Sequence, residues 1–421
     1  MPSPYLEILR SPRIAAVLLL GFSSGLPLAL TGGTLQAWLT VSGVNIVTIA
    51  WFSWIGIPYL LKFLWSPLMD RFVPPFLGRR RGWMLLTQLA LVLGIIALAS
   101  VSPQRNLWLV GGFALWVAFM SASQDIVIDA YRTDLLPAPE RGMGAAVGVL
   151  GYRVAMLASG GLALVLADQI GWRQTLFAMA ALMCIGLIVS IMAPEPAEGG
   201  APPASLRAAV TAPLKDLFSR PGALQLLALI ALYKFGDALA GTLATAFLIR
   251  GVGFSLTEVG AINKALGLAS LLAGGLVGGL LLVRMSLTRA LLLFGVLQAI
   301  SNLSFAVLAW AGKSYALLVF AVGFENLASG MGTAAFVAFA MALCNHSFSA
   351  TQYALLSAIA SLGRILFGPV SGAVVAATGW ANFFVLTFVA ALPGLWLVWR
   401  MREQIDAVDE ARPLKDTVKD E

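Results

Sequence analysis

The chain has 421 residues, of which 59% are hydrophobic and 11% are charged, and its mean hydropathy is +0.89. A soluble domain carries about 25% charged residues, so a soluble fold of this composition would expose too much apolar surface. The net charge of +7 comes without a basic groove and interleaved aromatic side chains, which argues against nucleic acid as a partner. Composition therefore predicts a protein embedded in a lipid bilayer, with its positive charges in the loops.

The cysteine and histidine residues predict neither a metal site nor a cofactor. Cys184 and Cys344 lie in apolar runs, where we expect reduced thiols that serve in packing. His346 is the only histidine of the chain, which excludes a site built from several histidines, and we expect it in a cytoplasmic turn.

Twelve apolar stretches are long enough to cross a bilayer, which takes about 20 mostly apolar residues. The first is too long for a cleaved signal peptide and leads directly into the second. The predicted spans, numbered in chain order, are residues 14–38, 46–69, 83–101, 107–131, 143–167, 174–194, 223–249, 257–283, 289–311, 315–344, 352–377 and 380–399.

The lysine and arginine residues divide unevenly between the two sides of the membrane. Eighteen fall in the termini and in the loops on the same side, whereas four fall on the opposite side. Because cytoplasmic loops carry an excess of positive residues, both termini are predicted to be cytoplasmic. The remaining five lie within the spans and are Lys62, Arg153, Lys234, Lys264 and Arg364.

A polar stretch divides the spans six and six. It is rich in proline, glycine and alanine, which is typical of a linker. The predicted domains are a six-helix bundle at 1–194, a cytoplasmic linker at 195–221, a second six-helix bundle at 222–400 and a cytoplasmic tail at 401–421. This plan, with the basic loop at 70–83, resembles the major facilitator superfamily, although the loop has extra prolines. The resemblance implies an all-α membrane protein with twelve transmembrane helices in two six-helix bundles.

Polar residues concentrate in spans 1, 4, 7 and 10, each the first helix of a three-span unit. In the superfamily these helices line the central cavity, whereas spans 3, 6, 9 and 12, here nearly free of charge, are set towards lipid. The polar bands consist of Ser23, Ser24, Thr31, Thr34 and Gln36 in span 1; Ser121, Ser123, Gln124, Asp125 and Asp129 in span 4; Lys234, Asp237, Thr242 and Thr245 in span 7; and Glu325, Asn326, Ser329 and Thr333 in span 10.

Two acids lie inside the apolar fourth span and suggest a protein that moves something across the membrane. Asp125 and Asp129 are four residues apart and share one helix face. An ionised carboxylate in hydrocarbon is costly, so this face must contact water, a cation or a proton pathway. We expect Asp125 to carry a proton, because burial favours its neutral form whereas Lys62 or Arg153 would favour its ionised form. A static salt bridge from Asp125 to span 2 or span 5 is the alternative.

Several blocks of the sequence resemble the AmpG-type muropeptide permeases. They are SGLPLAL at 24–30, KFLWSPLMDR at 62–71, GRRRGW at 78–83, SASQDIV at 121–127, LGYR at 150–153, SGGLAL at 159–164 and, less distinctively, YKFGD at 233–237. The resemblance implies proton-driven import of anhydro-muropeptides, which are N-acetylglucosaminyl-anhydro-N-acetylmuramyl peptides, across the bacterial inner membrane. It also implies a role in cell-wall recycling and, in some bacteria, in the signal that induces β-lactamase.

The charges inside the spans predict an anionic substrate. The five cations outnumber the four acids, and buried charges need partners, ligands or water. Stem-peptide carboxylates would supply such an anion. Lys234 and Asp237 are three residues apart and could instead neutralise each other. The residues expected to contact the substrate are Lys62, Gln124, Tyr152, Arg153, Lys234, Asp237, Lys264, Asn326 and Arg364.

Proton coupling and gating are predicted for further charged residues. Glu325 is expected to be a second proton site or a partner for a substrate amine. Asp129 is expected to pair with Arg71 or Arg79, and Asp70 with a helix N-terminus of the second half, in a cytoplasmic gate. The predicted gating set is Asp70, Arg71, Arg79, Arg80 and Asp129.

Other functions compete with this interpretation. A carrier of the same fold for another anion, such as an acyl-coenzyme A or an organic phosphate, agrees with the residue chemistry, and only the resemblance argues against it. An enzyme is not expected, because the short loops hold no pair of acids with useful spacing for a metal. A passive channel would need a symmetric oligomer or a filter, whereas we expect a monomer.

Overall fold

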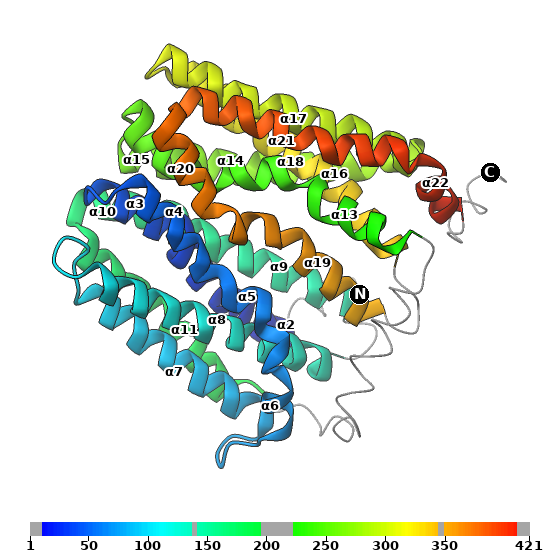
Figure 1. Ribbon diagram of the computed structural model, residues 1–421. Coiled ribbons are helices and arrows are strands. Elements are labelled where there is room, and N and C mark those ends of the chain that lie inside the picture. The colour runs from blue at the N-terminus through cyan, green and yellow to red at the C-terminus, as the bar shows by residue number, and fades with distance from the viewer. Residues whose placement is uncertain (1–10, 137–140, 195–221, 344–348, 411–421) are drawn as a thin grey trace, which may run out of the picture. The chain divides into compact units, whose positions relative to one another are not determined.

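Every regular element in the computed structural model is a helix, within the residues that it describes, 11–136, 141–194, 222–343 and 349–410 (Figure 1). In those residues, twelve helical segments are long and apolar enough to span a membrane. They are Pro12–Val41, Ile46–Leu64, Arg79–Ala99, Leu107–Arg132, Ala146–Ile170, Trp172–Met192, Ala223–Val252, Leu256–Arg284, Leu287–Ala311, Tyr315–Ala342, Ala358–Thr378 and Trp380–Arg400. The twelve predicted spans are therefore confirmed.

The first of two compact units comprises Met1–Asn45, Trp54–Ala204 and Ser255–Ala261. In this unit α7 (Arg79–Ala99) packs against both α8 (Leu107–Leu135) and α11 (Trp172–Met192) (Figure 1). Its other elements are α2 (Pro12–Ala29), η1 (Leu30–Thr34), α3 (Leu35–Val41), α5 (Ile57–Leu61), η3 (Lys62–Leu64), α6 (Ser66–Arg71), α9 (Arg141–Leu157), η5 (Ala158–Leu162), α10 (Ala163–Ile170) and α15 (Leu256–Glu258).

The second unit comprises Ile46–Ser53, Ser205–Phe254 and Ile262–Glu421. In this unit α17 (Leu287–Ala311) packs against both α18 (Tyr315–Ala342) and α21 (Trp380–Arg400) (Figure 1). Its other elements are α4 (Ile46–Trp51), α13 (Ala223–Tyr233), α14 (Phe235–Ala246), η6 (Phe247–Val252), α16 (Gly267–Arg284), α19 (Ser349–Leu366), α20 (Gly368–Thr378) and α22 (Arg402–Glu410). The segments η2 (Phe52–Gly56) and η7 (Val259–Leu266) each have residues in both units.

The domain boundaries expected from the sequence stay a prediction, because the linker at 195–221 lies outside the described residues. Cys344 and His346 lie outside them as well. Cys184 is a free thiol on α11, and its Sγ donates a hydrogen bond to the carbonyl of Ala180 at 3.5 Å. A thiol bonded to its own helix in this way serves packing, as expected.

Each unit buries its own apolar core and leaves other apolar side chains exposed. Tyr131 and Met84 are fully buried in the first unit, as are Phe294 and Phe339 in the second. On α16, by contrast, Leu276 and Leu280 are each 72% exposed. A membrane protein turns such side chains towards lipid, so the exposed surface suits hydrocarbon.

The first span bends where the sequence places proline and glycine. Pro27 lies inside α2 and has no N–H for the helix, and the π-helical segment η1 follows directly. Within it Gly32 leaves helical geometry, with φ −102° and ψ −112°. The first span therefore bends at Gly32.

Glycines on α2 allow the backbones of two helices to touch. A Cβ at Gly21 would overlap the carbonyl oxygen of Gly148 on α9, and a Cβ at Gly25 would overlap that of Tyr152. Small residues drive such close packing in membranes, where there is no hydrophobic effect between helices. This contact fixes α2 beside α9 and therefore fixes the side chains that α2 presents to the interior of its unit.

Adding a methyl group at Gly25 tests this packing. We expect Gly25→Ala to lower the free energy of unfolding by about 1–3 kcal/mol, because the backbone of α9 has to move away. The matched control is Gly112→Ala on α8, where no atom lies within 4 Å of the added methyl group. Thermal unfolding in detergent measures both variants, and equal melting temperatures would contradict the close contact.

Candidate functional site

The polar bands on the predicted lining helices come together inside each unit. In the first unit, hydrogen bonds join span 1 to span 4, whereas in the second unit they join span 7 to span 10. We call these groups the Asp125 cluster, formed by Asp125, Ser24, Lys62, Tyr59 and Tyr152, and the Asp237 cluster, formed by Asp237, Lys234, Ser329, Thr333, Gln298, Glu325 and Lys264.

Asp125 lies in the middle of α8 and accepts a hydrogen bond from a hydroxyl group. The donor is Ser24 Oγ on α2, at 2.5 Å from Oδ1. Ser24 is itself buried, and the glycine contact described above holds its helix in place. A hydroxyl group can donate to a carboxylate or accept from a carboxylic acid, so this bond suits both protonation states of Asp125.

Lys62 is the cation that acts on Asp125, although no salt bridge joins Asp125 to any cation in the described residues. The carboxylate of Asp129 also acts on Asp125, with the opposite sign of charge. Span 2 is broken at this level, where α5 ends and the 3₁₀ turn η3 starts at Lys62. The alternative of a static salt bridge at Asp125 therefore finds no support in the described residues.

Tyr59 and Gln124 bring unpaired polar atoms into the same region. Tyr59 lies one turn before Lys62 and within the electrostatic influence of Asp125, and its buried hydroxyl group lies near Ser121 and Thr31. In the described residues this hydroxyl group makes no hydrogen bond of good geometry. Both amide atoms of Gln124 are also buried without a partner, in a side chain that is 0% exposed. Sequence reasoning missed Tyr59. The only signal for it in the sequence was its position three residues before Lys62, an intramembrane lysine. Buried polar groups normally have partners, so unpaired ones suit water or a ligand.

A break in span 7 places the charges of the second cluster. Helix α13 ends at Tyr233, Lys234 has non-helical geometry, and α14 begins at Phe235, so Asp237 lies in the first turn of α14. Backbone N–H groups and the helix dipole favour an acid in that position. Interrupted helices of this kind form substrate and ion sites in transporters.

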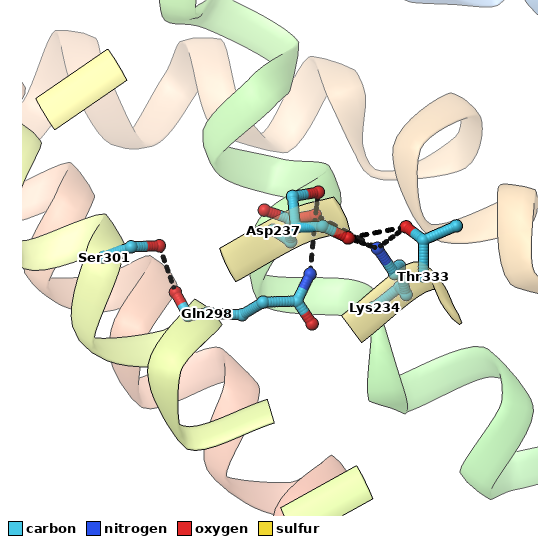
Figure 2. Close-up of polar contacts among 6 residues, drawn as sticks. Lys234, Asp237, Gln298, Ser301 and Thr333 are labelled. Atoms are coloured by element: carbon cyan, nitrogen blue, oxygen red, sulfur yellow. Dashed lines mark hydrogen bonds and ion pairs between the residues drawn. The ribbon is translucent and has the colours of Figure 1, made fainter. Parts of the chain in front are cut away.

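Figure 2 shows how the carboxylate of Asp237 is held. Its Oδ2 lies 3.7 Å from Lys234 Nζ and accepts hydrogen bonds from Ser329 Oγ at 3.1 Å and from Gln298 Nε2 at 3.4 Å. Lys234 Nζ also donates to Thr333 Oγ1 at 2.7 Å. The neutralisation of Lys234 by Asp237, which the sequence left open, is therefore present in the structure.

Glu325 and Lys264 complete the Asp237 cluster with one charge of each sign. Glu325 on α18 interacts electrostatically with Asp237, Lys234 and Lys264. Lys264 on η7 donates a hydrogen bond from Nζ to Thr245 Oγ1 on α14 at 3.3 Å. Two acids and two lysines thus share one buried region, in which an added proton or an added anion changes the balance of charge.

Other predicted substrate residues have weaker links to these clusters. Asn326 donates to the carbonyl of Val322 on its own helix at 2.9 Å. Arg153 contacts Met156 Sδ at 3.9 Å, and its Nε is buried without a partner. The side chain of Arg364 lies outside the described residues.

Two of the predicted gating residues form ion pairs within the described residues. Asp129 bonds to Arg132 of its own helix at 3.0 Å, and Arg80 bonds to Asp134 at 2.8 Å. Sequence reasoning missed Asp134, because an acid near the polar end of α8 gives no signal of its partner. Arg79 is the first residue of α7, and the side chains of Asp70 and Arg71 lie outside the described residues. The gate itself stays a prediction.

Comparison with known protein families matches residues 14–351 to the model of the Major Facilitator Superfamily. The anhydromuropeptide permease of Escherichia coli (strain K12) is 53% identical over 407 residues, which cover 96% of this chain and 83% of the relative. The putative transporter AmpG 4 of Rickettsia felis is 33% identical over 410 residues, covering 95% and 99% of the two chains.

Solved transporter structures have the same fold at low sequence identity. A bacterial homologue of the human lysosomal transporter Spinster, inward-facing and unoccupied, has a TM-score of 0.74 at 16% identity and covers 98% of this chain and 100% of its own. A POT family transporter in complex with 5-aminolevulinic acid has a TM-score of 0.75 at 12% identity, with coverages of 93% and 96%.

The Arg80–Asp134 pair should contribute more to stability than the Asp129–Arg132 pair. The side chains of the first pair are 13% and 20% exposed, whereas those of the second are 32% and 59% exposed. We expect Arg80→Gln to cost about 1.5–3 kcal/mol, because it leaves a poorly hydrated carboxylate, and the control Arg132→Gln to cost about 1 kcal/mol or less. Chemical unfolding in detergent compares the two variants, and equal costs would refute the ranking.

Proposed function

Because this chain belongs to the major facilitator superfamily and, within it, to the AmpG-type permeases, we propose that it imports anhydro-muropeptides from the periplasm to the cytoplasm in symport with protons. It is a transporter and not an enzyme. The observation that carries the choice of substrate is the similarity to the Escherichia coli permease over almost the whole chain.

The charges of both clusters support an anionic sugar-peptide as the substrate. Lys62 and Lys264 each lie in a buried polar region with no salt bridge in the described residues, so each can attract a carboxylate. Lys234 has a partner in Asp237, which a substrate carboxylate can replace. The stem peptide of a muropeptide carries several carboxylates, and the clusters offer several cations.

Proton coupling rests on Asp125 and, as a second site, on Glu325. Asp125 has a hydroxyl partner that suits both protonation states, and the only cation acting on it in the described residues forms no salt bridge with it. Its charge can therefore change without breaking an ion pair. Glu325 shares its surroundings with two lysines and one acid, so its charge depends on what else is bound there.

The proposed cellular setting follows from the same family. The protein lies in the bacterial inner membrane as a monomer, with both termini in the cytoplasm. The muropeptides that it imports enter cell-wall recycling and, in bacteria with an inducible enzyme, the signal for β-lactamase. Alternating access opens the two faces in turn, and residues of the predicted gating set close the cytoplasmic face.

Uptake into membrane vesicles tests the function. Vesicles that contain the protein are expected to accumulate labelled anhydro-disaccharide tripeptide when the outside is acidic, and to lose this accumulation when the proton gradient is collapsed. Asp125→Asn is expected to abolish accumulation and leave the melting temperature unchanged, because the amide keeps the shape but carries no proton. The matched control is Glu403→Gln, an exposed acid on α22 beyond the last span.

Two outcomes would contradict the proposal. Uptake of an acyl-coenzyme A or an organic phosphate without uptake of the muropeptide would assign this fold another anion. Accumulation against a gradient by the Asp125→Asn variant would show that a different acid couples transport to protons.

Neutral replacements of the lysines test how the substrate is recognised. Lys264→Gln and Lys234→Gln are expected to raise KM for the tripeptide-bearing muropeptide about ten-fold or more, since a charge-assisted hydrogen bond contributes about 1.5–3 kcal/mol. KM for the bare anhydro-disaccharide should change less, because that ligand lacks the peptide carboxylates. An equal change for both ligands would mean that the lysines serve only the structure of the unit.

A further inference from the structure

Span 9 contributes a buried side chain to the Asp237 cluster, although its lack of charge led us to expect a helix set towards lipid. Gln298 on α17 is 4% exposed, and its Nε2 donates to Asp237 Oδ2 at 3.4 Å. Figure 2 shows its carboxamide reaching from α17 towards Asp237 on α14. The sequence did not indicate this contact, since a neutral amide leaves the charge pattern of a helix unchanged.

A glycine on a third helix makes room for this carboxamide. A Cβ at Gly332 on α18 would overlap the Oε1 and Cδ atoms of Gln298, and no backbone atom is among its close contacts. The carboxamide therefore lies in a gap that exists because residue 332 has no side chain. Its free movement is restricted on one side by α18 and on the other by Asp237.

The equivalent span of the first half shows that a buried glutamine does not have to reach a charge. Gln88 on α7, in span 3, is 0% exposed and accepts a hydrogen bond from Ser190 Oγ on α11 at 2.7 Å. That bond ties two helices together through neutral groups. Gln298 differs because its partner is a carboxylate within a cluster of charges.

The bonds at Asp237 show what Gln298 adds. Lys234, Ser329 and Gln298 all contact Oδ2, whereas no group in the described residues donates a hydrogen bond to the buried Oδ1. The carboxyl group of Glu325 also lies against that of Asp237. The amide donor comes from a different helix than Lys234 and Ser329, so it fixes the carboxylate from a third direction. Without that donor, the carboxylate can turn and draw more fully on Lys234.

We propose that Gln298 is a positioning residue that holds the Asp237 carboxylate so that the Lys234 charge remains available to an anionic substrate. This inference rests on the proposed function. Gln298 acts through Asp237 and does not itself touch the substrate. Gly332 contributes to this positioning, because it provides the space in which the carboxamide of Gln298 is held.

The test compares Gln298→Met, which keeps the length of the side chain but removes its donor, with Gly332→Ala, which displaces the carboxamide. Both are expected to raise KM for the tripeptide-bearing muropeptide about three- to ten-fold in proteoliposomes and to leave KM for the bare anhydro-disaccharide within two-fold. Two matched controls should leave both KM values unchanged. One is Gly323→Ala on α18, the helix of Gly332, where the atom nearest to the added methyl group is 3.8 Å away. The other is Gln88→Met on α7 in the first unit.

A double-mutant cycle separates positioning from general stability. In an Asp237→Asn background, Gln298→Met is expected to change KM less than two-fold, because the carboxylate that it positions is gone. Independent, additive effects of the two substitutions would overturn the proposal, as would wild-type KM values in both Gln298→Met and Gly332→Ala.

Failure of the proposed function would be recognised separately. If the wild-type protein takes up no muropeptide, the double-mutant cycle of Gln298→Met and Asp237→Asn is measured as melting temperatures without substrate. Non-additive melting temperatures for Gln298→Met and Asp237→Asn would then support the positioning contact, and additive ones would overturn it.

Discussion

A charge placed inside a bilayer has to be stabilised by a partner, and this constraint organises both polar clusters. The cost of an unpartnered charge in hydrocarbon is large, so each intramembrane acid here lies near hydroxyl groups, amides or cations. The partners are of different kinds. Asp125 has a serine and a lysine that forms no salt bridge with it, whereas Asp237 has a lysine, a serine and a glutamine. A hydroxyl partner permits a change of charge, and an ion pair resists one.

The helices are interrupted at residues that carry these charges. The first helix of span 7 stops before Lys234 and the second starts after it, and span 2 passes from an α-helix to a 3₁₀ turn at Lys62. A continuous helix would satisfy its own backbone and present only side chains. An interrupted one also offers a helix N-terminus, where Asp237 lies.

Close packing of backbones gives the Asp125 cluster its precision. The hydroxyl group of Ser24 reaches Asp125 because α2 is held directly against α9 through Gly21 and Gly25. In the second unit the same principle operates at Gly332, where a missing side chain leaves space for Gln298. Both sites thus depend on glycines that carry no chemistry of their own.

The amino-acid sequence was enough to predict the twelve spans, because the length and apolarity that a bilayer demands can be read residue by residue. It also determined which helices carry charge, since Asp125, Lys234 and Asp237 stand out within apolar runs. Which groups meet could be seen only in the folded protein. Gln298 is an uncharged residue in an apolar helix, and Tyr59 and Asp134 look unremarkable in one dimension. Their roles depend on contacts with residues far along the chain, such as Asp237 more than 60 residues before Gln298, and these contacts are set by how the helices pack.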